Sequence, residues 1–122
     1  MPFDVVMEGT RMSVRVRGTV TAEELLDLVD QVAALESAQP TTPDRIIDVT
    51  EAEAMNAGFP EMLGLAQRRR AAELRNPIRS AVVTSNDVQY GMARMYQTLN
   101  DHPQITLRIF KSLSEATDWL DS

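Results

Sequence analysis

Hydrophobic and polar residues alternate strictly along residues 12–17 (MSVRVR), so that one side of this segment is apolar and the other polar. This period of two predicts a strand with one exposed face. Residues 3–7 (FDVVM) show a similar pattern, and only a short polar turn separates the two segments. Because so short a connection joins antiparallel strands, the chain is expected to begin with a hairpin.

Two further segments, residues 45–49 and 78–84, are nearly continuous apolar runs. Runs of this kind indicate strands that are covered on both faces, as in the middle of a parallel sheet. Residues 105–110 (ITLRIF) alternate again. We therefore expect segments 45–49 and 78–84 to run side by side in the same direction, with segments 12–17 and 105–110 nearer the edges.

Four segments show the spacing of an amphipathic helix. The first follows Thr21, which forms a capping box with Glu24, and the others span about residues 60–74, 87–100 and 113–120. Glu36 is predicted on the exposed side of the first helix. The predicted core positions are Leu25, Leu28, Val29, Val32 and Leu35 in the first helix and Val88, Met92, Met95 and Leu99 in the third.

The order of elements is therefore ββαβαβαβα. Alternating strands and helices imply parallel pairing through right-handed crossovers. The predicted fold class is α/β, with a five-stranded mixed sheet of order 1-2-3-4-5, an antiparallel first strand and about four helices.

The totals restrict the class of protein. The 122 residues predict one domain, spanning residues 1–122, and the absence of cysteine excludes disulfides and thiolate metal sites. A net charge of −6 disfavours nucleic-acid binding. No apolar run approaches the ~20 residues that cross a bilayer, so we expect no membrane insertion and a cytoplasmic location.

Residues 50–60 are predicted to form an acidic loop after a central strand, the usual place for a site in an α/β protein. Asp48, Glu51 and Glu53 can in principle bind a hard cation. Their spacing matches no metal-binding loop, however, and a solvated loop is the preferred interpretation. We predict no metal, no cofactor and no catalytic residue here.

For the basic residues and the single histidine, a solvent-exposed position without a binding role is also the preferred interpretation. Arg68, Arg69 and Arg70 point in different directions on a helix, while Arg68 and Arg75 are expected to share one face. A solvated helix face is preferred over a partner contact. His102 lies between Asp101 and Pro103 and is predicted in a surface turn.

The best candidates for binding are polar and aromatic. Thr84, Ser85 and Asn86 open the third helix, where backbone N–H groups can hold an anion or where the side chains simply cap the helix. The Met-Tyr segment that follows is typical of a contact surface. The candidate ligand- or partner-binding residues are Asn56, Gly58, Phe59, Thr84, Ser85, Asn86, Tyr90 and Tyr96.

Three stretches together carry a family resemblance: VRVRGTVTAEELLDLVDQV, RSAVVTSNDVQYGMARMYQTL and the ending ITLRIFKSLSEATDWL. The chain resembles the SpoIIAA-like or STAS-like bacterial domains, in particular a small branch that closes with a strand, a Phe, a polar turn and a short helix. The resemblance implies a β-α superhelix, a fold shared with the CRAL-TRIO lipid-binding proteins. Fold alone does not assign function.

The best-known members of that family are anti-sigma-factor antagonists, which are phosphorylated on a hydroxyl residue at a helix start. In this chain Asn56, Ala57 and Gly58 stand where the signature should be, and no Ser or Thr lies between Glu51 and Arg75. The phosphorylation switch therefore does not carry over to this chain.

We expect a non-enzymatic domain that acts by binding a protein, a second copy of itself included. The alternative is a carrier of a small apolar ligand, which a cavity of roughly 300 Å³ or more would favour. An enzyme with an unusual site is the third option.

Overall fold

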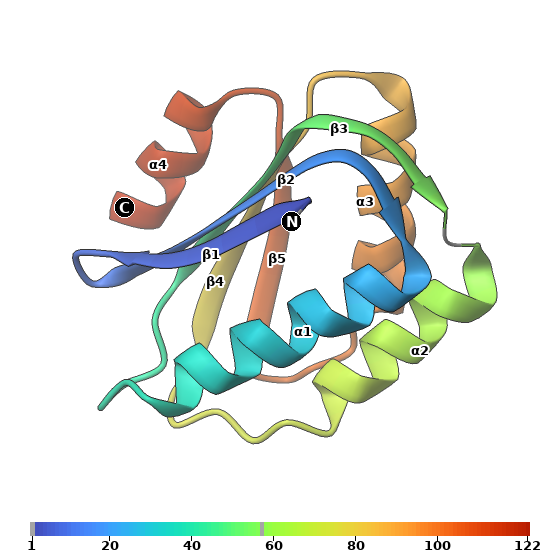
Figure 1. The fold of residues 1–122 in the computed structure, drawn as a ribbon. Coiled ribbons are helices and arrows are strands. Elements are labelled where there is room, and N and C mark those ends of the chain that lie inside the picture. The colour runs from blue at the N-terminus through green and yellow to red at the C-terminus, as the bar shows by residue number, and fades with distance from the viewer. Residues whose placement is uncertain (1, 57) are drawn as a thin grey trace.

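A hairpin of β1 (Phe3–Glu8) and β2 (Arg11–Thr21) forms one side of a five-stranded sheet in the computed structural model, which describes residues 2–56 and 58–122 (Figure 1). The two strands are antiparallel, as predicted. Gly9 stands in the turn between them with a φ of 66°, a left-handed conformation that glycine adopts without steric cost.

The remaining strands are β3 (Arg45–Asn56), β4 (Ile78–Val83) and β5 (Ile105–Phe110). The order is β1-β2-β3-β4-β5, and all pairs from β2 onward are parallel. Ile47 pairs with Val82, and Val82 pairs with Ile109, so branched side chains form a row across the sheet. The predicted fold class and the central parallel pair β3 and β4 are confirmed.

The helices cover the two faces unequally. α1 (Ala22–Ser37), α2 (Phe59–Arg70) and α3 (Asp87–Leu99) pack over one face, around the main apolar core (Figure 1). α4 (Leu113–Asp121) packs alone on the other face, where Ala116 and Leu120 meet Ala81 and Val83. Because α4 packs against β3, β4 and β5, the outer face of β1 and β2 is uncovered by the described helices, which explains why Arg15 is exposed while Val14 and Val16 are buried.

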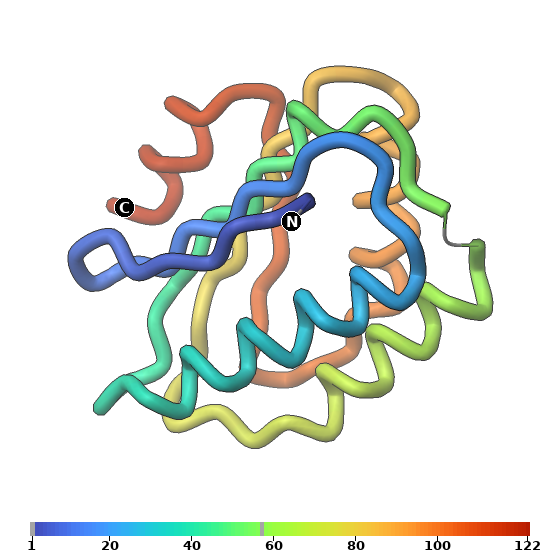
Figure 2. The backbone as a smooth tube through the Cα atoms, viewed as in Figure 1, coloured from blue at the N-terminus to red at the C-terminus, as the bar shows by residue number. Residues whose placement is uncertain are grey.

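The predicted acidic loop at residues 50–60 is wrong, because β3 continues to Asn56. Its second half pairs with the second half of β2, from Arg17 opposite Glu51 to Thr21 opposite Asn56. The two strands bend together (Figure 2). Gly18, at a φ of 67°, stands between two register shifts of this ladder. The pairing satisfies backbone groups that a loop would have left to water, and local sequence does not reveal that partner.

Two side chains lie on the opposite side from the one predicted. Glu36 is buried, whereas Val88 is 67% exposed. The face of α3 that meets the sheet contains Gln89 and Met92, and Val88 lies one residue, or about 100°, away from that face. The other predicted core positions of α3, Met92, Met95 and Leu99, pack against the main core as expected.

The second helix ends earlier than predicted, at Arg70 instead of Leu74. The chain after it is held by side chains from elsewhere: the Leu74 N–H donates to Gln104 Oε1 at 3.0 Å, and the Arg75 N–H donates to Thr42 Oγ1 at 3.1 Å. Among the described residues, no helix is long and apolar enough to cross a membrane.

Candidate functional site

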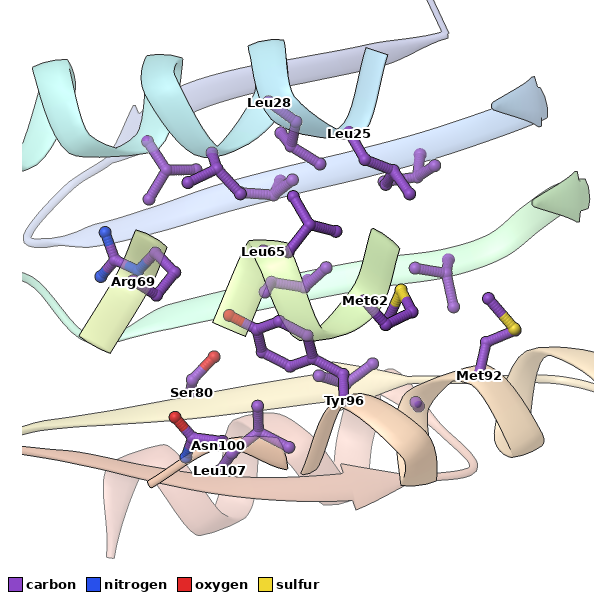
Figure 3. A pocket seen from close by; sticks show the side chains of 18 of the residues that line it. Leu25, Leu28, Met62, Leu65, Arg69, Ser80, Met92, Tyr96, Asn100 and Leu107 are labelled. Carbon is purple, nitrogen blue, oxygen red and sulfur yellow. The ribbon is translucent and has the colours of Figure 1, made fainter. Parts of the chain in front are cut away.

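A cavity of about 140 Å³ lies between the inner face of the sheet and the three helices that cover it (Figure 3). Nearly all of its wall is apolar. The apolar lining residues include Val14, Leu25, Leu28, Ile47, Val49, Met55, Met62, Leu65, Val82, Met92, Ala93 and Leu107. The cavity is a consequence of the fold, because strand and helix faces that the sequence predicted as core leave this space between them.

One end of the cavity is polar and charged. Glu36 of α1, Arg45 of β3 and Arg69 of α2 form a buried group, which we call the triad. Glu36 accepts from Arg69 Nη1 and Nη2 at 2.9 and 3.1 Å and from Arg45 Nη1 at 2.8 Å. Arg45 Nε also donates to Ser80 Oγ of β4 at 3.2 Å. The triad thus links two helices to two strands.

The triad carries two positive charges and one negative charge. Burial, followed by the nearby charge of Arg69, lowers the pKa of Arg45, while Glu36 opposes this shift. Withdrawing charges from water costs several kcal/mol per ion, so a buried excess of one positive charge is expensive unless something compensates it. This excess is an unusual feature for a core to contain.

Arg69 adds a second sign of incomplete pairing. Its side chain is almost fully buried and lines the cavity, yet among the described residues its Nε has no hydrogen-bond partner. Buried polar groups are paired in the great majority of cases, and an unpaired donor costs roughly 1–3 kcal/mol.

Asn100, the C-cap of α3, also lines the polar end, and so does Tyr96 of α3. Its ring lines the cavity, and its hydroxyl points toward the end where Arg69 and Ser80 lie (Figure 3). Burial raises the pKa of Tyr96, an effect that Arg45 and Arg69 partly offset and Glu36 reinforces. The hydroxyl is therefore protonated at neutral pH and is available as a donor.

Gln89 stands at another part of the cavity wall and is fully engaged. Its Nε2 donates to the carbonyls of Thr50 and Ala52 at 3.2 and 2.8 Å, and its Oε1 accepts from the Ser85 N–H at 2.7 Å. Gln89 thereby fastens the start of α3 to the extended part of β3. This residue has a structural role and leaves no free group for a ligand.

The structure places the predicted Thr84–Asn86 group at the start of α3. Thr84 is buried, Asn86 accepts from the Gln89 N–H at 2.9 Å as the N-cap, and the Ser85 hydroxyl bonds to Gln89. These contacts match the capping alternative, since the side chains are used within the protein.

The predicted residues Asn56, Gly58 and Phe59 are exposed: Asn56 ends β3, Gly58 is the N-cap of α2 and Phe59 is its first residue. The Ser85 hydroxyl donates to the Thr50 carbonyl of β3 at 3.3 Å, and Asn56 lies six residues further along that strand, which is roughly 20 Å. The structure therefore does not join the two predicted groups into one site. Ala57 lies outside the described residues.

The two predicted tyrosines lie in different environments. Tyr90 is 44% exposed on α3, as a contact surface requires, whereas Tyr96 faces the cavity. Sequence reasoning missed Glu36, Arg45 and Arg69 as a unit, because each charged residue by itself is typical of a surface position. One sequence feature does indicate burial: Arg45 directly precedes an apolar run that lies in the middle of the sheet.

The other basic candidates also differ from their predictions. Arg69 is buried instead of solvated, and Arg68 pairs with Asp30 on the exposed side of the helices. Arg75 lies beyond α2 and shares no helical face with Arg68; its Nη1 donates to the Gln39 carbonyl at 2.6 Å. That contact places a cation at the carboxyl end of α1, where the helix dipole favours it.

The prediction of a surface turn for His102 is wrong. The ring is buried, with Nε2 donating to the Ala72 carbonyl at 2.6 Å and Nδ1 accepting from the Gln104 N–H at 3.1 Å. Both ring nitrogens are occupied by backbone, which gives the side chain a structural role. It holds the chain after α2 against the turn before β5.

The acidic residues do not converge. Glu51 and Glu53 are exposed on β3, and Asp48 Oδ1 accepts from the Thr50 hydroxyl at 2.6 Å. In the part of the chain that the structure describes, no three His, Cys, Asp or Glu side chains are grouped so as to hold a metal ion.

A protein-family model described as SpoIIAA-like matches residues 11–121. The chain belongs to the SpoIIAA-like family. The predicted resemblance is confirmed over nearly the whole chain. Among curated proteins, none matches.

Two solved structures share the SpoIIAA-like fold with this chain. One is an uncharacterised protein of the DUF3478 family from Shewanella loihica PV-4, at 16% identity and a TM-score of 0.62, covering 97% of this chain and 91% of that one. The other is an anti-sigma factor antagonist from Mycobacterium paratuberculosis, at 13% identity and a TM-score of 0.65, covering 98% and 93%. At such identities the similarity establishes the fold alone.

Proposed function

We propose that this SpoIIAA-like chain is a non-enzymatic interaction domain that binds a protein partner or a second copy of itself. Its binding is not switched by phosphorylation at the start of α2. The observation that carries the proposal is the chemistry of that helix start. Gly58 is the N-cap, no side chain caps the helix, and Phe59 is 55% exposed. An exposed aromatic ring is typical of an interface anchor.

The only histidine supports the non-enzymatic part of the proposal. Acid–base and nucleophilic catalysis by histidine requires a free ring nitrogen within reach of a substrate. Both ring nitrogens of His102 are engaged by backbone groups, and the side chain is buried near the carboxyl end of α2, whereas Gly58 and Phe59 lie at its start.

The test compares two exposed apolar residues. Phe59→Ser removes the ring at the start of α2, whereas Leu113→Ser removes a similarly exposed side chain from α4. Size-exclusion chromatography with light scattering measures self-association, and affinity capture from the native cell measures binding to other proteins. We expect the association to be lost with Phe59→Ser and kept with Leu113→Ser. A strict monomer that captures nothing specific would contradict the proposal.

A second candidate function is carriage of a small apolar ligand in the cavity beneath α1, α2 and α3, although this cavity is smaller than the roughly 300 Å³ expected of a carrier. Its volume of about 140 Å³ is below the ~300–1,000 Å³ of typical ligand pockets, so a long-chain lipid does not fit. It is close to an engineered cavity of ~150 Å³ that binds benzene. Native mass spectrometry of freshly purified protein tests this function, and the expected adduct has the mass of a single-ring compound.

A further inference from the structure

Within the triad, hydrogen-bond donors exceed acceptors. Each guanidinium group carries several N–H donors and no acceptor. Glu36 already accepts three hydrogen bonds from Arg45 and Arg69, and the Nε of Arg69 is left without a partner among the described residues. The hydroxyl of Tyr96 points toward the same end. The triad therefore needs a further hydrogen-bond acceptor.

The charge of the triad specifies which acceptor. Arg45 and Arg69 face one carboxylate, that of Glu36, which leaves an excess of one positive charge in a buried place. A ligand with a single negative charge neutralises the group, whereas a doubly charged phosphate would reverse its sign. Arginine also binds carboxylates in the planar, forked geometry that Glu36 already displays with Arg69.

The remainder of the cavity specifies the body of the ligand. Beyond the triad the walls are formed by aliphatic and methionine side chains such as Leu28, Met62, Leu65 and Met92 (Figure 3). The volume suits about one ring. Methionine is flexible enough to adapt to the shape of such a guest.

We propose that the cavity binds a small monocarboxylate with an apolar body of about one ring, with its carboxylate held by Arg45, Arg69 and the Tyr96 hydroxyl. The inference rests on the second candidate function and adds the chemistry of the ligand. It also explains why a core that could have been closed by apolar residues contains two arginines for one glutamate.

The probe is phenylacetate, and its matched control is phenylacetamide, which has the same shape without the charge. Each is titrated into the protein and followed by ¹H–¹⁵N NMR, with toluene as an apolar reference. Phenylacetate is expected to bind at least about tenfold more tightly than the amide, as charge-assisted hydrogen bonds predict. It should also shift the Nε–H signal of Arg69 further than the amide does, because a carboxylate is the stronger acceptor.

Two variants locate the site. Arg69→Met is expected to abolish the preference for phenylacetate while toluene still binds. Ala93→Met, which fills the cavity from α3 without altering any charge, is expected to weaken all three compounds at least about tenfold. The shift of the Arg69 Nε–H signal tests head-group binding in the unaltered protein, should Arg69→Met fail to fold.

The outcomes distinguish recognition of the carboxylate head group from carriage of an apolar ligand. Equal binding of phenylacetate and phenylacetamide would overturn the proposed head-group recognition and leave apolar-ligand carriage standing. Failure of toluene and both probes to bind would overturn carriage as well. Binding of phenylacetate that Ala93→Met leaves unchanged would place the site elsewhere and overturn the inference.

Discussion

Glu36 and Arg69 form a two-pronged ion pair in the core, with both carboxylate oxygens accepting from the guanidinium at 2.9 and 3.1 Å. The residues come from different helices, 33 positions apart in the chain, and each side chain is almost completely shielded from water. The pair fixes how α1 and α2 lie over the sheet. It also forms the charged end of the apolar cavity between the sheet and the three helices.

Replacing Glu36 by Leu should destabilise the fold strongly. Arg45 and Arg69 would then face each other without a counter-charge, and breaking a buried ion pair by removing one partner typically costs about 3–5 kcal/mol. Urea denaturation measures the change. Asp27→Ala, at an exposed acid of the same helix, is the control and should stay within about 0.5 kcal/mol. An equal, small effect of both variants would show that the triad contributes little.

Replacing the whole triad should restore much of that loss. In Glu36→Leu/Arg45→Met/Arg69→Met no buried charge remains, and apolar replacement of a buried ion group is often neutral or stabilising. We expect the triple variant to be more stable than Glu36→Leu alone by at least about 2 kcal/mol. A triple variant that is as unstable as the single one would mean that shape, and not charge, dominates at this position.

Gln89→Ala should loosen the far part of β3. The substitution removes the hydrogen bonds to the carbonyls of Thr50 and Ala52, and leaving buried groups unpaired costs about 1–3 kcal/mol each. Hydrogen exchange should quicken in residues 50–56 before it quickens in residues 45–49. Gln67→Ala, at an exposed position of α2, is the control. Uniform exchange along β3 would contradict the proposed anchor.

Ala93→Met should stabilise the empty protein. A methionine at this position fills part of the cavity with apolar atoms, and cavity-filling changes commonly add about 0.5–2 kcal/mol. The thermal midpoint, measured by circular dichroism in the absence of added ligand, should rise. A fall in the midpoint would indicate that the surrounding side chains cannot move to accept the new group.

Tyr96 should ionise above its ordinary pKa of 10.0, chiefly because the hydroxyl is buried. The unfolded chain then loses this proton first. The contribution of Tyr96 to stability is accordingly complete below pH 10 and declines as the pH rises through the folded-state pKa. Absorbance titration at alkaline pH, with Tyr96→Phe to identify the signal, measures the shift. A Tyr96 component that titrates at or below pH 10 would refute it.

Much of the fold can be predicted from the sequence because the relevant signals are local. The period of two at residues 12–17, the apolar runs near Ile47 and Val82, and the capping pair Thr21 and Glu24 each report on their own element. The alternation of strands and helices then restricts the sheet order through the handedness of the crossovers. The structure agrees on the order and on which strands are central.

The sequence by itself determined the order of the elements, the sheet order and the absence of Ser and Thr between Glu51 and Arg75, because these follow from residue type and near neighbours. Tertiary structure alone decided that Glu36, Arg45 and Arg69 meet. Considered separately, each of these charged residues is typical of a surface position. Only the packing of the three elements excludes water from them. The same reason applies to His102 and to the far half of β3, whose partners lie on other segments of the chain.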